Sequence, residues 1–157
     1  MKRVNKIINH SLFRLQLENL EITEKNRIFC HHSIDHLLAV ARIMEIKSKE
    51  NSLNIKKEII YATALLHDIG RDIAYKKHSN HALESKIIAQ DILKDCGFTE
   101  EADEILFAIE HHNDDIAANT LCTLLRQADK LSRNCFICKA YNECNWSTEK
   151  KNRGIDL

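Results

Sequence analysis

The chain contains no proline and only three glycines among its 157 residues. Proline and glycine supply the backbone conformations on which tight turns depend. A turn-rich all-β fold would therefore be hard to build from this sequence, whereas long uninterrupted helices are permitted. The length suits one domain with a full core, and apolar residues make up 44% of the chain, which is enough to fill that core.

Hydrophobic periodicity predicts about six helices, with no linker, low-complexity tract or internal repeat. The expected helices cover roughly residues 3–19, 25–47, 55–69, 80–95, 99–112 and 116–141. The third is apolar nearly all round from Ile59 to Leu66, which places it at the centre of a bundle. Gly97 and Phe98 mark the end of the fourth helix. Thr99 is the expected N-cap of the fifth, and the sixth has a break near Arg133.

These patterns predict an all-α, single-domain helical bundle that spans residues 1–157. Its core covers about residues 25–135, and a cysteine-containing extension follows over residues 135–157. The tail from Asn145 onward is expected to be loosely ordered. We also expect a homodimer as the assembly.

Charge and hydropathy exclude several classes of partner. Basic and acidic side chains balance at 23 each, so the charge total calls for neither nucleic acid nor an anionic membrane. Aromatic residues are only 6% of the chain, which argues against a base-stacking platform. No stretch approaches the ~20 apolar residues of a membrane span. His10 and Arg14 interrupt any signal-peptide core, so we expect a cytoplasmic protein without a DNA or membrane partner.

The distribution of histidines points to one functional region. All nine lie at or before position 112, and all but His10 fall between residues 31 and 112. The pair His67-Asp68 directly follows the apolar run of the third helix. Adjacent side chains on a helix diverge by about 100°, so one helix does not easily aim both into an ordinary core contact. A metal ion accepts both, because imidazole nitrogen and carboxylate oxygen are common ligands.

Other candidate ligands stand on other predicted helices, and each alone has a structural explanation. His36 could be a satisfied core histidine, and Asp129 could form a surface ion pair with a nearby arginine. His111 and His112 close the fifth helix, where a cation is favourable without any metal. Taken together they favour a metal site, because a bundle brings side chains from several helices to one interior point.

These residues resemble the HD-domain superfamily of metal-dependent phosphohydrolases over roughly residues 25–135. The matching order is His36 in His-Leu-Leu-Ala-Val, His67-Asp68 in Leu-Leu-His-Asp-Ile-Gly, and Asp129 in Ala-Asp-Lys. The resemblance implies an all-α fold in which these four residues bind one metal.

The choice of first ligand follows from the family's first motif. His36 precedes Val40 by four residues, as in that motif, so His36 is preferred to His31 or His32.

The resemblance also implies a second metal. Some members of the superfamily bind it with two further histidines, with the HD aspartate as a bridge. Here His81 in His-Ala-Leu-Glu-Ser and His112 in Ile-Glu-His-His match those positions, with His111 as the neighbouring alternative to His112. We therefore predict one or two divalent transition metals, with the dinuclear site bridged by Asp68 as the preferred reading. Mixed histidine and carboxylate ligands suit iron, manganese, zinc, nickel or cobalt.

The predicted function is hydrolysis of a small phosphorylated metabolite or nucleotide by metal-activated water. The expected catalytic residues are Asp68 and two phosphate contacts, Arg71 and Arg133. Certain nucleotidase members carry a catalytic glutamate three residues after the HD aspartate. That position here is Arg71, so their mechanism is not carried over. Asp72 and Asp115 are candidate proton-transfer groups or ordinary surface acids.

Two other functions are compatible with the same residues. The resemblance includes di-iron oxygenases, whose ligand set is similar. A non-catalytic metal or nucleotide sensor would use the same ligands without turnover. Metal identity and oxygen-dependent turnover separate the first of these from a hydrolase, and ligand binding without turnover identifies the second.

The last quarter of the chain carries a separate cysteine motif. Cys135 and Cys138 have the two-residue gap common in zinc and iron–sulfur sites, and Cys144 could be a third ligand. No fourth ligand is obvious, since Cys122 would serve only if the fold brought it close. The alternatives are small apolar residues on one helix face, or a redox-active thiol. The remaining cysteines are expected as buried small residues: Cys30 and Cys96.

Overall fold

The computed structural model describes residues 1–114 and 119–155. Those residues form eight α-helices and one short 3-10 turn, and they contain no strand. The elements are α1 (Lys2–Asn9), α2 (Ser11–Glu24), α3 (Ile34–Glu50), α4 (Lys57–Leu66), α5 (Arg71–Lys77), α6 (His81–Cys96), α7 (Ala102–His111), α8 (Thr120–Leu131) and η1 (Cys135–Ile137). The all-α fold class is confirmed, with more and shorter helices than the sequence predicts.

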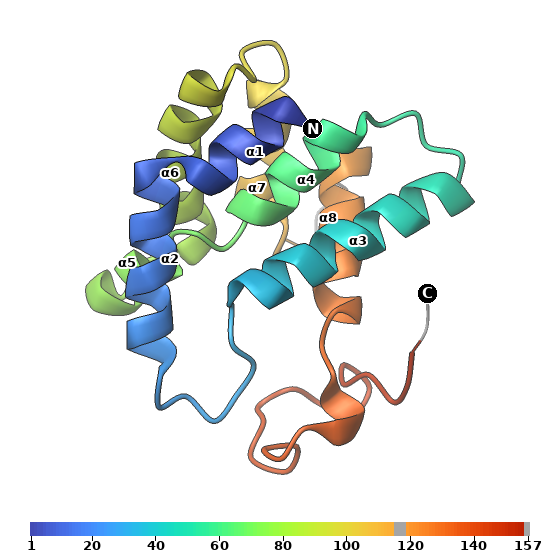
Figure 1. Ribbon diagram of the computed structural model, residues 1–157. Helices are drawn as coiled ribbons and strands as arrows, with labels where there is room; N and C mark the ends of the chain where they lie inside the picture. The colour runs from blue at the N-terminus through green and yellow to red at the C-terminus, as the bar shows by residue number, and fades with distance from the viewer. Residues whose placement is uncertain (115–118, 156–157) are drawn as a thin grey trace.

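Helix α4 occupies the centre of the bundle. It contacts α1, α3, α6, α7 and α8, and Figure 1 shows it in the middle of the view among these elements. Its residues from Ile59 to Leu66 are buried except for Tyr61, which confirms the prediction drawn from its lack of a polar face. The central position matters for function, because the chain leaves α4 directly into the His67-Asp68 pair.

The predicted first helix is wrong in its continuity. It is divided at His10, whose backbone is extended (φ −68°, ψ 131°). The ring of His10 accepts a hydrogen bond from the Leu12 N–H, so this side chain caps the start of α2. The break allows α1 and α2 to pack on different parts of the bundle: α1 contacts α4, whereas α2 contacts α5.

The predicted second helix begins nine residues too early. Residues 25–33 are not helical, and α3 starts at Ile34. The cause is the buried carboxylate of Glu24, which accepts hydrogen bonds from the backbone N–H and the ring of His32 at 2.7 and 2.6 Å. These bonds hold the chain in a loop, so the helix cannot continue from α2.

The predicted third helix ends early, at Leu66, and residues 67–70 form a turn. Gly70 is required in this turn because a Cβ atom there would lie 2.3 Å from the backbone nitrogen of Ser85. The Gly70 N–H donates to the Ser85 hydroxyl at 2.9 Å, which fixes the turn against α6. The short helix α5, which the sequence analysis did not predict, follows directly.

The ends of α6 are close to the prediction. The Asn80 side chain accepts hydrogen bonds from the Ala82 and Leu83 N–H groups at its start. Gly97 closes the helix in the left-handed conformation at φ 84°, and Phe98 behind it is fully buried.

The predicted cap of α7 is wrong. Thr99 lies in a turn, and the helix begins at Ala102. The Glu101 carboxylate just before it binds the Arg3 guanidinium at 2.9 Å, a contact across the fold that sequence spacing does not reveal.

The predicted last helix is too long. Helix α8 covers Thr120–Leu131, and the expected start at residue 116 lies outside the described residues. Beyond α8 the chain is irregular apart from η1, so Cys135 and Cys138 do not share an α-helix face. Figure 1 shows this tail as an orange and red segment below the helical body, beyond the end of α8.

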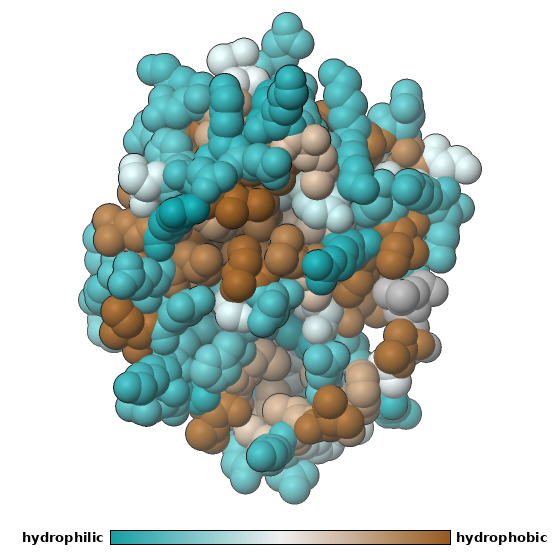
Figure 2. All heavy atoms as spheres, viewed as in Figure 1, coloured by the Kyte–Doolittle hydropathy of each residue, from teal (hydrophilic) through white to brown (hydrophobic). Residues whose placement is uncertain are grey.

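The described residues contain no helix that is both long and apolar enough to cross a membrane. Figure 2 shows apolar atoms gathered across the middle of the face in view, with polar atoms above and below them. The expected homodimer stays a prediction.

Candidate metal centre

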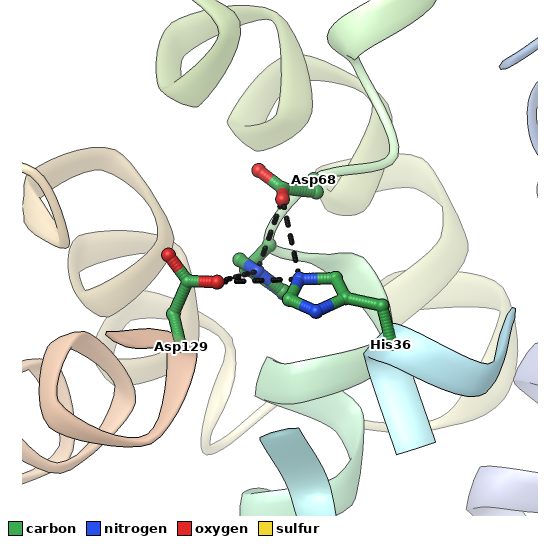
Figure 3. A group of neighbouring side chains, drawn as sticks. His36, Asp68 and Asp129 are labelled. Atoms are coloured by element: carbon green, nitrogen blue, oxygen red, sulfur yellow. Dashed lines mark ion pairs between the residues drawn. The ribbon is translucent and has the colours of Figure 1, made fainter. Parts of the chain in front are cut away.

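Four of the predicted ligands meet at one point inside the bundle. His36 comes from α3, His67 and Asp68 from the turn after α4, and Asp129 from α8; their ligand atoms all lie within 4.8 Å of one another. The His36 Nε2 atom is 3.2 Å from Asp129 Oδ1, and the His67 Nε2 atom is 3.2 Å from Asp68 Oδ2. Figure 3 shows His36, Asp68 and Asp129 pointing toward one another from separate elements.

A second group forms on the other side of the Asp68 carboxylate. The Nε2 atoms of His81 and His112 lie 3.5 and 3.9 Å from Asp68 Oδ1. The first group uses Asp68 Oδ2, so the two oxygens of one carboxylate face different groups. This is the arrangement that a bridging ligand requires.

The structure thus brings all six predicted metal ligands together, and it places His112 rather than His111 at the site. His111 is directed elsewhere, since its ring bonds the Asp114 carboxylate at 2.6 Å. Their role as ligands stays a prediction, because the geometry shows proximity rather than binding.

Backbone carbonyl groups orient two of the histidine rings. The Nδ1 atom of His67 donates to the Ala64 carbonyl at 2.7 Å, and that of His112 donates to the Ile109 carbonyl at 2.6 Å. Carbonyl groups in the last turn of a helix lack helical partners, so they are free to accept these bonds. In both rings the Nε2 atom is left to face Asp68, which is the tautomer that a metal ligand needs.

The other two histidines are held by side chains. The Ser132 hydroxyl donates to the Asp129 carbonyl at 2.7 Å and accepts from His36 Nδ1 at 3.2 Å, which leaves His36 Nε2 to face the Asp129 carboxylate. The Asn113 amide lies 3.0 Å from the Nε2 atoms of both His81 and His112. Because an amide NH2 group donates, both nitrogens are unprotonated acceptors.

Sequence reasoning missed a buried pair beside the first group. His32 contacts the Glu24 carboxylate at 2.6 Å, and its other ring nitrogen lies 3.8 Å from Asp68 Oδ2. Burial lowers the pKa of His32 to about 4, against the opposing effect of Glu24. Burial would raise the pKa of Glu24, but its bonds with His32 lower that pKa to about 2. No local pattern identifies this pair, because the two residues are joined by a non-helical loop.

The two arginines predicted as phosphate contacts lie beside the ligand groups. The Nε atom of Arg71 lies 2.8 Å from Asp68 Oδ1 as an ion pair, although the alignment is poor for a hydrogen bond. Arg133, at 6% exposure, donates to Asp129 Oδ1 at 2.7 Å, and the same nitrogen lies 3.3 Å from His36 Nε2. Both guanidinium groups therefore stand beside the carboxylates around which a phosphate would bind.

The candidate proton-transfer acids receive no support. Asp72 is buried, so it is not a surface acid. Its carboxylate accepts hydrogen bonds from the Thr23 hydroxyl at 2.6 Å and from the Lys76 ammonium group at 2.8 Å. Asp115 lies outside the described residues.

The electrostatics keep the central carboxylate charged. Burial alone would raise the pKa of Asp68, but the nearby charges of Arg71 and His67 hold it well below the ordinary value. Burial would likewise lower the pKa of His67, but Asp68 and Asp129 raise it to about 10. Burial and the charge of Arg71 lower the pKa of His81 to about 3. His81 is therefore neutral at neutral pH, whereas His67 carries a proton that a metal would displace.

The residues fit a divalent transition metal. Six buried side-chain atoms in the described part of the chain have no hydrogen-bond partner, and three of them lie at the centre of the site: His67 Nε2 and both carboxylate oxygens of Asp68. Such atoms are costly to bury unless they are paired or bind a metal. The donor set of imidazole nitrogens and carboxylate oxygens is the one that zinc, iron, manganese, nickel and cobalt accept.

Two cavities border the site. The first, of about 300 Å³, is lined by Arg71, Asp129 and Arg133 together with the loop before α3 and the C-terminal tail. The second, of about 570 Å³, is lined by His112, Asp129 and residues of α8 and the tail. Asp129 lines both cavities, so both reach the first ligand group.

An all-α bundle with two groups of histidine and aspartate around a shared carboxylate defines a helical metal-binding protein. The HD-domain family model matches residues 33–134, which contain all six predicted ligands. The chain therefore belongs to the HD-domain family of metal-dependent phosphohydrolases, as the motifs indicated, and this family binds divalent metals.

Relatives of two kinds match the sequence. An uncharacterized protein of Clostridium beijerinckii is 42% identical over 153 residues, which are 97% of each chain. Ribonuclease Y of Frankia alni is 33% identical over 98 residues, which are 62% of this chain and 12% of that one. Ribonuclease Y of Desulfotalea psychrophila is 34% identical over 100 residues, 63% of this chain and 18% of that one. The similarity thus covers less than a fifth of either ribonuclease. No solved structure matches the chain.

Proposed function

We propose that the protein hydrolyses a small phosphate ester or nucleotide at a dinuclear metal site. The observation that carries the proposal is the shared carboxylate of Asp68, which lies between two ligand groups and beside a cationic side chain, Arg71. Relatives named ribonuclease Y are consistent with chemistry on a phosphoester bond.

Bound divalent metals would lower the pKa of a coordinated water to about 7 and offset the charge that develops on phosphorus. Asp68 would fix the spacing of the two metal positions, because its two oxygens face one group each. Arg71 and Arg133 would orient the phosphate, since a guanidinium group matches two phosphate oxygens with a pair of parallel hydrogen bonds. Both arginines line the first cavity, so they are accessible from it.

The cavities favour a small substrate with an organic part. Their volumes of about 300 and 570 Å³ lie in or near the range of small-molecule sites. Trp146 lines both cavities, and Phe29 and Tyr141 line the first, so an aromatic face stands near the cations. A nucleotide or another phosphorylated metabolite presents the matching combination of a phosphate and an apolar group.

The arginines favour a phosphate ligand over the oxygenase alternative, and turnover separates a hydrolase from a sensor. An oxygenase with the same ligands has no need for two guanidinium groups beside its carboxylates. A sensor would bind a phosphate there without turnover. Anaerobic purification followed by metal analysis and a screen of phosphate esters, with and without oxygen, decides among the three.

The decisive variant is Asp68→Ala. We expect it to lose hydrolysis and most of its metal while far-UV circular dichroism shows the helices retained. The matched control is Asp91→Ala, which removes an exposed carboxylate from α6 and should leave turnover and metal content unchanged. Full turnover by Asp68→Ala would show that the shared carboxylate is not part of the reaction.

A further inference from the structure

Four of the six cysteines line a single cavity. Cys30 lies in the loop before α3, and Cys135, Cys138 and Cys144 lie in the tail after α8, yet all four border the cavity of about 300 Å³. Cys30 is therefore the fourth cysteine that the motif in the tail lacked, and Cys122 does not take that place. The other two cysteines are buried in the hydrophobic core: Cys96 and Cys122.

We propose that Cys30, Cys135, Cys138 and Cys144 ligate an iron–sulfur cluster. Four cysteine thiolates are the common ligand set of such clusters, and a two-residue gap between two of them recurs in their motifs. Here the gaps in the tail are two and five residues, and the fourth ligand comes from a segment more than a hundred residues earlier. None of these four thiols belongs to the two histidine and aspartate groups.

The thiols are not gathered closely enough for a single zinc ion. With Zn–S bonds of about 2.3 Å, a tetrahedral site holds its sulfur atoms about 3.8 Å apart. Within the described residues, no three cysteine sulfurs lie within 4.8 Å of one another. A cluster holds its thiolates farther apart, because they bind different iron atoms around an inorganic core. The part of this cavity that the cysteines line would hold such a core, and the part that Arg71 and Arg133 line would be left for the phosphate.

Cationic groups stand where the cluster's negative charge would need them. Arg27 donates from Nε to the Cys30 carbonyl at 3.0 Å. Lys151 donates to the Tyr141 carbonyl at 2.6 Å, between the second and third cysteines of the tail. Both basic residues line the cavity, and they are distinct from Arg71 and Arg133, which contact the carboxylates of the metal centre.

A cluster would also explain how the tail is held. Residues 135–155 contain no α-helix or strand, only the three-residue η1 and irregular turns, and Ile137 and Ile155 are 72% and 80% exposed. Among the described contacts, the Asn152 amide ties the tail to carbonyl groups at the end of α8. A segment with so little apolar burial is commonly fixed by a metal or a disulfide. The cluster would join the tail to the loop before α3, and the tail would then form one wall of the cavity beside Asp129.

The test is acid-labile sulfide, together with visible absorption, in the full chain purified without oxygen and supplied with iron and sulfide. We expect the wild type to contain sulfide in a fixed ratio to protein. Cys30→Ala, Cys138→Ala and Cys144→Ala should each lose at least about nine-tenths of it. The matched control Cys96→Ala removes a core cysteine and should keep its sulfide. Asp68→Ala should also keep its sulfide while losing the other metals, so this result is independent of the proposed hydrolysis.

Limited proteolysis provides a second readout. The tail of Cys30→Ala should be cut faster than that of the wild type, although position 30 is far from the tail in sequence. Circular dichroism checks that the helices are retained, and the half-buried Cys138 and Cys144 offer variants that spare the core. A wild type without sulfide, zinc bound by these cysteines, or sulfide retained in all three alanine variants would overturn the proposal.

Discussion

At the residue scale, Asp68 and His81 differ in how many metal positions they can affect. Asp68 faces both ligand groups, whereas His81 faces only Oδ1 and the second group. We therefore expect His81→Ala to bind one metal per chain where the wild type binds two. His36→Ala is the counterpart of His81→Ala at the first group, because His36 belongs to that group only. Metal analysis of the purified variants measures the ratio, and an unchanged ratio in His81→Ala would favour a mononuclear site.

Gly70 controls the position of the ligand pair through its lack of a side chain. A Cβ atom at this residue would lie 2.3 Å from Ser85 N and 2.4 Å from the Glu84 carbonyl carbon, and backbone atoms do not move aside easily. Gly70→Ala should therefore destabilise the protein by about 1–3 kcal/mol, the usual range for overpacking. It should also weaken metal binding, because Asp68 is two residues away.

Urea denaturation of metal-free protein measures the first effect and titration with metal measures the second. Gly154→Ala is the control, since no atom lies within 4 Å of the Cβ position there. If Gly70→Ala matched that control in both experiments, the close approach of α6 would not matter for the site.

The site residues that sequence analysis found are those carried by short motifs. His67 and Asp68 are adjacent, and His36, Asp129 and the second-group histidines lie in recognisable local patterns. His32 was set aside because His36 fits the family's first motif better. Its contact with Glu24 was missed because the two residues are joined by a loop that the helical pattern did not predict. Residues that act through a distant partner leave no local trace in the sequence.

At the scale of elements, Arg3 ties the first helix to the rest of the bundle. Its guanidinium group bonds Glu58 of α4 at 2.9 Å, Glu101 before α7 at 2.9 Å and the Gly97 carbonyl at 3.0 Å. It also lies 4.1 Å from the centre of the Phe98 ring. Hydrogen bonds from Arg3 lower the pKa of both glutamates. This network adds to the burial of Val4 and Ile7, the core residues of this short helix.

Arg3→Ala should cost about 1 kcal/mol of stability at neutral pH, since the pairs are partly exposed and screened by solvent. A carboxylate with a lowered pKa stabilises the fold above its unfolded pKa, and that contribution is lost as the pH falls through the folded value. The difference between wild type and variant should therefore shrink below the ordinary glutamate pKa of 4.5. Urea denaturation at neutral and acidic pH measures it. Arg14→Ala, which removes only bonds near the α1–α2 junction, is the control. A difference that stayed constant with pH would contradict this account.

Some helix ends could be predicted from the sequence and others could not. The ends of α6 were predicted because Asn80 and Gly97 act on the backbone beside them. The breaks at His10 and over residues 25–33 were not predicted, since the chain has no proline and almost no glycine to mark them. In this sequence side chains such as His10 and Glu24 make the breaks by forming hydrogen bonds with the backbone. In the sequence alone, these residues look the same as ordinary polar residues on the surface of a helix.

At the scale of the whole molecule, the six predicted metal ligands come from five parts of the bundle. They lie on α3, the turn after α4, α6, the end of α7, and α8. Metal ions bound there would connect segments that are otherwise joined by apolar packing and a few polar contacts, such as the hydrogen bond from the Gly70 N–H to the Ser85 hydroxyl. The bundle itself has a continuous hydrophobic core that does not include these residues, so the helices are expected to form without metal. The metal should therefore add stability to a fold that already exists.

Removing the metal should lower the free energy of unfolding of the wild type by an amount that depends on the affinity and the concentration of the metal. A ligand that binds only the folded state at a hundred times its Kd contributes about 2.7 kcal/mol. Because Asp68 and Asp129 overcome the effect of burial and raise the pKa of His67 to about 10, metal binding displaces a proton from this ring at neutral pH. The affinity should then fall about tenfold for each unit that the pH is lowered, and the stabilisation should fall with it.

Thermal unfolding with added metal or with a chelator, at two or three pH values, measures both effects. Asp68→Ala should show no shift between the two conditions, since it lacks the carboxylate common to both groups. Asp91→Ala should shift as the wild type does, because this acid is exposed on α6. An equal shift in Asp68→Ala would mean that the metal stabilises the chain from another site. A wild-type shift that did not depend on pH would mean that His67 gives up no proton on binding.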